Sequence, residues 1–133
     1  MKTRKARELT MKFRDETHEQ EFKALMKRMG ADSRDVYRLA LAYLITADKV
    51  CCEHIHNIYD FDECCINPDC LAAGWQTSTT LKTCRLAFNL FNGGLGWCDD
   101  DDKCLVTPAE IFCCRLAPFY LEAVKLRYPE YME

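Results

Sequence analysis

Cysteines and histidines are the side chains of this sequence with the most specific chemistry. The chain has 133 residues, of which ten are cysteine and three are histidine. Cys52 and His56 are four residues apart, a spacing that places two side chains on one face of a helix. Structural zinc sites take four sulfur or nitrogen ligands in a tetrahedron. We therefore expect one structural zinc ion, with these candidate ligands: Cys52, His56, Cys65 and Cys70.

The sequence leaves the choice of ligands open. No C-x2-C pair is present, and the doublet Cys64-Cys65 offers two sulfurs at one place. Cys98 and Cys104 form a second candidate pair that could replace either half of the zinc site.

The remaining cysteines and one histidine are expected in the core. Cys84, Cys113 and Cys114 fall on predicted amphipathic helices, and free cysteine is a common small buried residue. His54 falls near the buried side of its predicted helix. We interpret it as a hydrogen-bonded core histidine and not as a ligand.

Acidic side chains are the second feature with functional meaning. Residues 1–14 carry a net charge of +5 and the other 119 residues sum to −8, within a total of −3. Such an acidic body favours cationic protein partners, including proteins that bind nucleic acid, over nucleic acid itself. The run 99–102 lacks the alternating spacing of a calcium loop. We expect these acidic residues to contact a protein partner: Asp60, Asp62, Glu63, Asp99, Asp100, Asp101 and Asp102.

Catalysis is not expected. The sequence contains no G-x-S-x-G, H-E-x-x-H, Walker or G-x-G-x-x-G motif. Two alternatives remain open: a cysteine nucleophile beside His54 or His56, and a catalytic metal with Glu53 or Glu63 as general base.

Helices must position these residues. Apolar side chains recur at helical spacing, and the fold class is therefore expected to be mostly α, a compact bundle of about five helices with irregular cysteine-rich loops. Asp32 or Ser33 is expected to cap the second helix, and Ser78 the fourth. The wide apolar stripe of the second helix predicts that it forms the centre of the core. Thr107 and Glu110 predict a capping box, and Pro118 predicts a kink in the last helix. The predicted helices span residues 15–29, 33–47, 49–61, 78–91 and 107–127, with no competing strand.

The chain is expected to form one domain, residues 11–133, preceded by a flexible basic arm over residues 1–10. It carries no apolar run of transmembrane length and no secretory signal. We expect a protein of the bacterial cytoplasm, where cysteines are thiols or metal ligands and not disulfides.

Three stretches of the sequence together resemble a known family. They are Ile58-Tyr59-Asp60-Phe61, Pro68-Asp69-Cys70-Leu71 through Gly74-Trp75-Gln76-Thr77-Ser78 to Phe91-Asn92-Gly93, and Thr107-Pro108 to Tyr128-Pro129-Glu130-Tyr131. This pattern resembles small uncharacterised proteins of firmicute genomes and prophages, a family that implies no known activity. It is also similar in type to the zinc-containing anti-CRISPR proteins of streptococcal prophages. That likeness implies an inhibitor that binds a type II RNA-guided DNA nuclease and blocks the loading of target DNA.

A second function is a zinc-containing regulator that binds nucleic acid through the basic arm. Lys2 to Arg14 would contact phosphates in that case. The net charge of −8 on the rest of the chain speaks against it.

Overall fold

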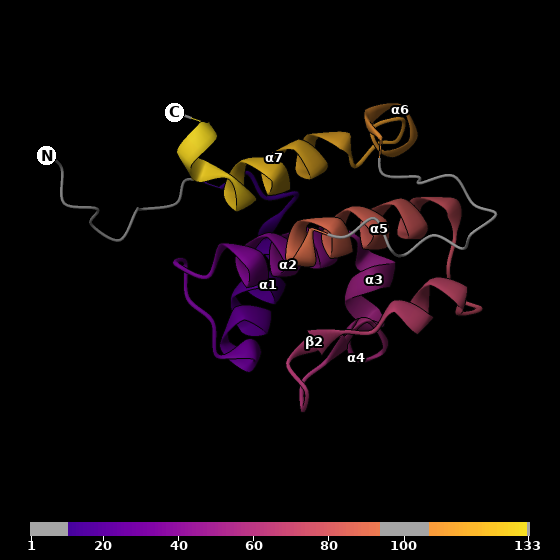
Figure 1. Ribbon diagram of the computed structural model, residues 1–133, viewed down its shortest axis with the longest axis horizontal. Helices are drawn as coiled ribbons and strands as arrows, with labels where there is room; N and C mark the ends of the chain where they lie inside the picture. Colours follow the sequence, from indigo (N-terminus) through magenta and orange to yellow (C-terminus); the bar gives the residue numbers. More distant parts are fainter. Residues whose placement is uncertain (1–10, 94–106, 133) are drawn as a thin grey trace, which may run out of the picture.

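The structure is a computed structural model that describes residues 11–93 and 107–132 (Figure 1). The described part is mostly helical, which confirms the expected fold class. In chain order the elements are α1 Glu16–Met29, α2 Val36–Ala47, α3 Lys49–Glu53, α4 Ile55–Ile58, β1 Tyr59–Asp60, β2 Cys65–Ile66, the 3-10 helix η1 Pro68–Ala72, α5 Ser78–Asn92, α6 Pro108–Ile111, α7 Ala117–Arg127 and the 3-10 helix η2 Pro129–Tyr131. The basic arm expected over residues 1–10 lies outside the described residues.

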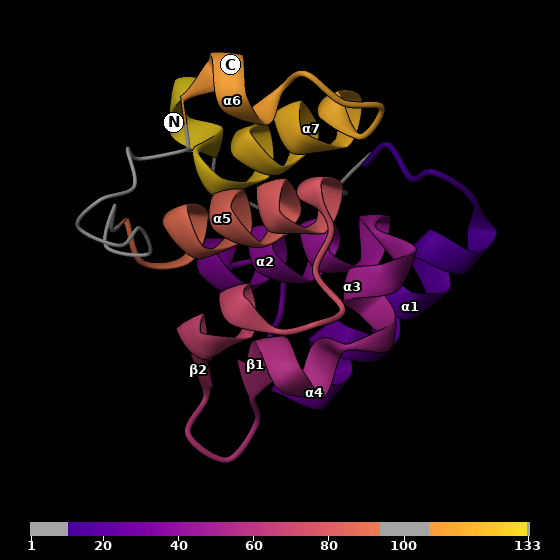
Figure 2. The same ribbon diagram turned by 90° about the vertical axis from the view of Figure 1, so that its right-hand side faces the viewer.

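Helix α2 is the centre of the core, as its sequence predicts. It packs against α1, α5 and α7, and the views in Figures 1 and 2 place it among these helices. Every residue from Leu39 to Ala47 is buried. A helix that is apolar on all sides is stable only where other elements surround it, and this explains its position.

In the part of the chain that the structure describes, no helix has the length and apolar character of a membrane span.

The ends of α1 and α5 follow the chemistry of their flanking residues. Asp15 caps α1 by accepting a hydrogen bond from the amide of His18. Gly30 and Gly93 end α1 and α5 with φ of 67° and 71°, a left-handed conformation that glycine adopts without steric cost. Thr77 caps α5 in a capping box with Thr80, so the expected cap at Ser78 is wrong by one residue.

The cap of α2 also differs from the prediction. Asp35 accepts a hydrogen bond from the amide of Arg38 at 3.1 Å and is the cap residue, not Asp32 or Ser33. The Asp32 carboxylate instead bonds the amide and the guanidinium of Arg34, and this local turn delays the start of the helix.

The predicted helix over residues 49–61 is wrong beyond residue 58. His54 adopts φ −109° and ψ 25°, which separates α3 from α4, and the chain then enters an antiparallel pair of short strands. Asp60 pairs with Cys65, and the Asp60 carboxylate accepts hydrogen bonds from the amides of Asp62 and Glu63. This side chain offers the backbone a turn in place of the next helical bonds. The expectation that no strand forms is therefore also wrong.

The last predicted helix is two helices. Thr107 precedes α6 and Pro108 occupies its first turn, but Thr107 makes no side-chain capping bond. Pro118 lies in the first turn of α7 and does not kink a helix, because a missing N–H is tolerated there. Cys113 is exposed in the turn between α6 and α7, which makes its predicted core position wrong, whereas Cys114 is partly buried.

Candidate functional site

The acidic hairpin, residues 59–66, carries three of the residues expected to contact a partner. Asp60, Asp62 and Glu63 are all exposed. The turn that joins β1 to β2 extends away from the helical body (Figure 2). In the described part of the chain none of these carboxylates forms an ion pair. Their negative charge is therefore presented to solvent.

Two arginines contact the acidic hairpin at its first strand and at its turn. The Arg38 guanidinium donates to the carbonyl oxygen of Cys64 at 2.9 Å and to the hydroxyl of Tyr59 at 3.1 Å. The bond to Tyr59 raises the pKa of Arg38 above its usual value, with a further contribution from Asp35. The Arg28 guanidinium lies 4.0 Å from the centre of the Phe61 ring, within the range of a cation–π contact. These contacts attach the hairpin to α1 and α2.

A surface pocket of about 540 Å³ lies beside the acidic hairpin. It is lined by His56, Tyr59, Asp60, Phe61, Asp62, Cys65, Ile66 and Asn67. The pocket combines carboxylates, an imidazole and aromatic surface, which suits a cationic side chain of a partner protein.

The four predicted zinc ligands do not meet. His56 and Cys65 line the same pocket. Cys52 instead lies with its sulfur 3.7 Å from a carboxylate oxygen of Glu21, and Cys70 is buried in the core. Across residues 11–93 and 107–132, no three His, Cys, Asp or Glu side chains are arranged to hold a metal ion. Cys98, Cys104 and Asp99 to Asp102 lie outside the described residues.

A different set of cysteines does meet. Cys51, Cys70 and Cys84 come from α3, η1 and α5, and all three are buried. The sulfur of Cys51 lies 3.8 Å from that of Cys84, and the side-chain amide of Gln76 donates to the Cys84 sulfur at 3.7 Å. Hydrogen bonds from Cys51 and Cys70 hold the pKa of the Cys84 thiol below its usual value, against the opposing effect of burial. We call these three residues the thiol cluster.

Sequence reasoning placed Cys84 in the core but did not predict the thiol cluster. The three cysteines are separated by 19 and 14 positions, intervals that match no ligand motif. The only local signal was the position of Cys51 on the same helix face as Ile55 and Ile58.

His54 has the hydrogen bond that the sequence predicted. Its Nδ1–H donates to the carbonyl oxygen of Val50 at 2.9 Å, and its ring stacks on Trp75 with the ring centres 4.4 Å apart. The side chain is half-buried, so it belongs to the edge of the core.

Asp48 is the centre of a network of buried polar side chains, which sequence reasoning did not predict. One carboxylate oxygen accepts from the amides of Val50 and Cys51 and caps α3. The other accepts from the Thr83 hydroxyl at 3.0 Å, and the Thr83 and Tyr120 hydroxyls are 2.7 Å apart. The side chains of Asp48, Thr83 and Tyr120 thus join the amides at the start of α3 to α5 and α7.

The comparisons with known proteins give a family but no activity. No curated protein and no solved structure matches the chain. A family model matches residues 8–133, which is nearly the whole length. The chain therefore belongs to DUF6075, a family of unknown function.

Proposed function

We propose that this chain is a non-enzymatic protein that binds a basic protein partner through the acidic hairpin and the pocket beside it. The observation that supports the proposal is the exposure of Asp60, Asp62 and Glu63 on a hairpin that Arg38 bonds at its first strand and at its turn. A rigid, charged surface loses little conformational entropy on binding, and its charge attracts an oppositely charged partner.

The pocket gives the hairpin a second means of recognition. An arginine or lysine that enters beside Asp60 and Asp62 would exchange water for carboxylate partners. Half-buried Phe61 supplies aromatic surface at the same place. The proposed partner therefore carries a protruding cationic side chain within a larger basic surface.

A type II RNA-guided DNA nuclease is the candidate partner that we propose, on the basis of the resemblance to prophage proteins. Such nucleases hold nucleic acid in a positively charged channel. An acidic protein bound there would prevent target DNA from loading. The effect on DNA cleavage distinguishes an inhibitor of the nuclease from a protein that only binds it.

The test combines binding with cleavage. Purified protein is mixed with the nuclease and its guide RNA, and both complex formation on gel filtration and cleavage of target DNA are measured. The inhibitor proposal expects a complex and reduced cleavage. A complex without reduced cleavage would support partner binding but reject inhibition. The absence of a complex with several type II nucleases would reject this class of partner.

Two charge-reversal variants test whether binding depends on the acidic hairpin itself or only on the negative net charge of the protein. The double variant Asp62→Lys and Glu63→Lys should abolish the complex, because it reverses the exposed charge at the tip of the hairpin. The double variant Glu110→Lys and Glu130→Lys changes the net charge by the same amount at exposed positions on α6 and η2. Equal loss of binding in both variants would contradict the assignment to the hairpin.

A structural zinc ion is a separate part of the proposal. It is supported by His56 and Cys65, which line one pocket, and no third ligand accompanies them in the described part of the chain. We expect about one zinc per purified chain by elemental analysis, reduced by Cys65→Ser. A metal-free protein would remove zinc from the proposal and leave the charge argument for the acidic hairpin unchanged.

A further inference from the structure

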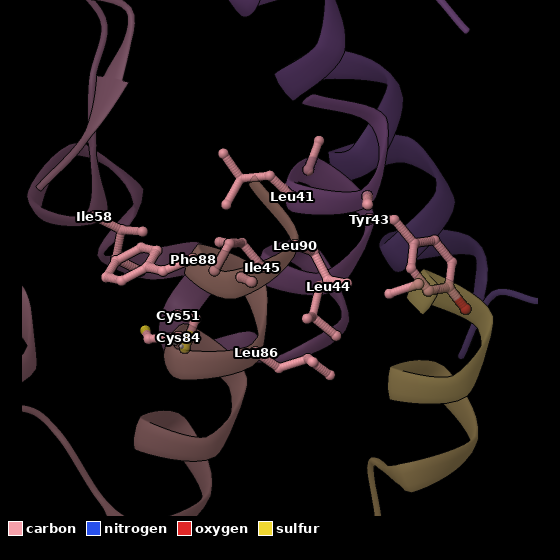
Figure 3. Packing of buried hydrophobic residues seen from close by; sticks show 14 of the residues in the cluster. Leu41, Tyr43, Leu44, Ile45, Cys51, Ile58, Cys84, Leu86, Phe88 and Leu90 are labelled. Atoms are coloured by element: carbon pink, nitrogen blue, oxygen red, sulfur yellow. Dashed lines mark hydrogen bonds between the residues drawn. The ribbon is translucent and has the colours of Figure 1, made fainter. Parts of the chain in front are cut away.

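The thiol cluster brings two sulfurs from separate helices close enough to react with each other. Cys51 on α3 and Cys84 on α5 have their sulfurs 3.8 Å apart, and Figure 3 shows the two side chains next to each other in the core. A disulfide has an S–S length of about 2.05 Å, so the two sulfurs need to approach by about 1.8 Å. Rotation of the two side chains and a small shift of the five-residue helix α3 can supply that movement.

The surroundings make Cys84 the more nucleophilic of the two. The Gln76 amide donates to its sulfur at 3.7 Å and also to the carbonyl oxygen of Cys70 at 3.0 Å. Cys51 lies within 3.9 Å of the carbonyl oxygen of Thr80, an acceptor that favours the protonated thiol. The hydrogen-bond donors therefore point to Cys84 as the sulfur that carries negative charge when the cluster loses a proton.

We propose that Cys84 and Cys51 form a peroxide-sensitive pair that is converted to an intramolecular disulfide by hydrogen peroxide. The Cys84 thiolate attacks one peroxide oxygen, the O–O bond breaks, and the departing hydroxide takes up the proton lost by Cys84 and leaves as water. Cys84 is then a sulfenic acid. The Cys51 sulfur attacks the Cys84 sulfur, the S–O bond breaks, and the Cys51 proton leaves with the hydroxyl group as a second water. Two thiols are oxidised and one peroxide is reduced.

Hydrogen peroxide is small and uncharged, so it suits a buried site better than a bulky disulfide oxidant. A pocket of about 300 Å³ lies beside the first residues of α3 and α5, with Val50 and Thr80 in its lining. Val50 precedes Cys51, and the backbone of Thr80 contacts the Cys51 sulfur. Because the sulfurs themselves are fully covered, reaction requires a local opening of α3, and its rate should follow the frequency of that opening.

The experiment uses the full-length protein without denaturant. It is treated with hydrogen peroxide, quenched with an alkylating reagent, digested and analysed by mass spectrometry. The expected product is a peptide pair joined through Cys51 and Cys84. Cys51→Ser and Cys84→Ser should each lose this pair, and Cys113→Ser, a change at an exposed cysteine, should keep it.

Several results would overturn the proposal. One is that Cys51 and Cys84 remain reduced while exposed cysteines oxidise, and another is that Cys84 joins Cys70 and not Cys51. Bound zinc that protects the cluster from peroxide until it is chelated would overturn it too. Serine in the core can prevent folding, so a thermal unfolding curve accompanies each variant. If a variant does not fold, the peptide map of the unmodified protein decides the question.

Discussion

The Nε2 nitrogen of His18 lies 2.9 Å from the carbonyl oxygen of Tyr43, and this bond joins α1 to the central helix α2. The other ring nitrogen, Nδ1, accepts a hydrogen bond from the amide of Arg14 at 3.0 Å. The ring is fully buried. These two bonds require a neutral imidazole with its proton on Nε2, because a protonated ring has no acceptor for the Arg14 amide.

The first prediction concerns the pH dependence of stability. Burial is the main cause that lowers the pKa of His18 below its usual value of 6.5. Well above pH 6.5 the His18 ring is neutral in both the folded and the unfolded chain. As the pH falls below 6.5, the unfolded chain binds the proton more readily than the folded chain, and the free energy of unfolding therefore falls. Urea unfolding should show this loss between pH 7 and pH 5.

The variant His18→Gln provides the control for that prediction. It should be less stable than the unmodified protein at pH 7.5, by roughly 1–3 kcal/mol, because the Arg14 amide loses its acceptor and the Tyr43 carbonyl oxygen loses one of its two side-chain donors, keeping Thr46. Its stability should then change less between pH 7 and pH 5. An identical pH dependence in the two proteins would mean that another group titrates in this range.

Sequence reasoning predicted the long helices and the central position of α2, because these depend on local caps and on apolar spacing. It failed where a single side chain redirects the chain. The Asp60 carboxylate forms the turn of the acidic hairpin, and in the sequence it is indistinguishable from any other exposed aspartate of a helix. Helical spacing alone therefore predicted a third helix that extends beyond its actual end.

The residues of the candidate site were likewise predicted only in part. The acidic residues Asp60, Asp62 and Glu63 were identified as a group, because residues close in sequence stay close in the fold. The thiol cluster was not, since η1 brings Cys70 to the core only after the hairpin has reversed the chain. Cysteine spacing predicts a site only when its ligands come from one local motif.

A second prediction tests the buried polar network around Asp48. Asp48→Ala removes the cap of α3 and the acceptor for Thr83, and should lower the free energy of unfolding by about 2–4 kcal/mol. Tyr120→Phe removes one hydroxyl and leaves Asp48 bonded to Thr83, and should cost about 1 kcal/mol. Thermal and urea unfolding of both variants measures the difference. Equal costs would show that Tyr120 and Asp48 act as one unit.

A third prediction tests the packing of the central helix. Leu44 is fully buried in α2, and Leu44→Ala should cost about 2–5 kcal/mol through lost burial and the cavity left behind. Leu121 on α7 is 50% exposed, and Leu121→Ala should change stability by about 0.5 kcal/mol or less. Urea unfolding of the two variants provides the comparison. A similar cost for both would contradict the assigned position of α2.

A fourth prediction tests the role of Arg38 in fixing the acidic hairpin. Arg38→Met removes the bonds to Tyr59 and Cys64 but keeps a long apolar stem. The Asn67 amide donates to the carbonyl oxygen of Ile58 at 2.8 Å and closes the open end of the hairpin. Its hydrogen exchange should become at least several-fold faster, because the hairpin opens more often. Arg34→Met breaks an exposed ion pair with Asp32 and should leave the exchange of this amide unchanged. Unchanged exchange in Arg38→Met would show that strand pairing alone holds the hairpin.

The last prediction concerns how the acidic hairpin meets its partner. If exposed carboxylates attract a basic surface over a distance, they act mainly on the association rate, because long-range attraction speeds the encounter and is screened by salt. Raising the ionic strength from low to high should slow association on the order of tenfold and change dissociation much less.

The double variant Asp62→Asn and Glu63→Asn should show slow association already at low salt, with a weaker dependence on salt concentration. Neutralising Asp99 to Asp102 instead tests the second acidic stretch in the same assay. Stopped-flow or surface-binding kinetics with the candidate nuclease separates the two rates. A variant that dissociates faster but associates normally would show that Asp62 and Glu63 make short-range contacts in the complex and do not steer the encounter.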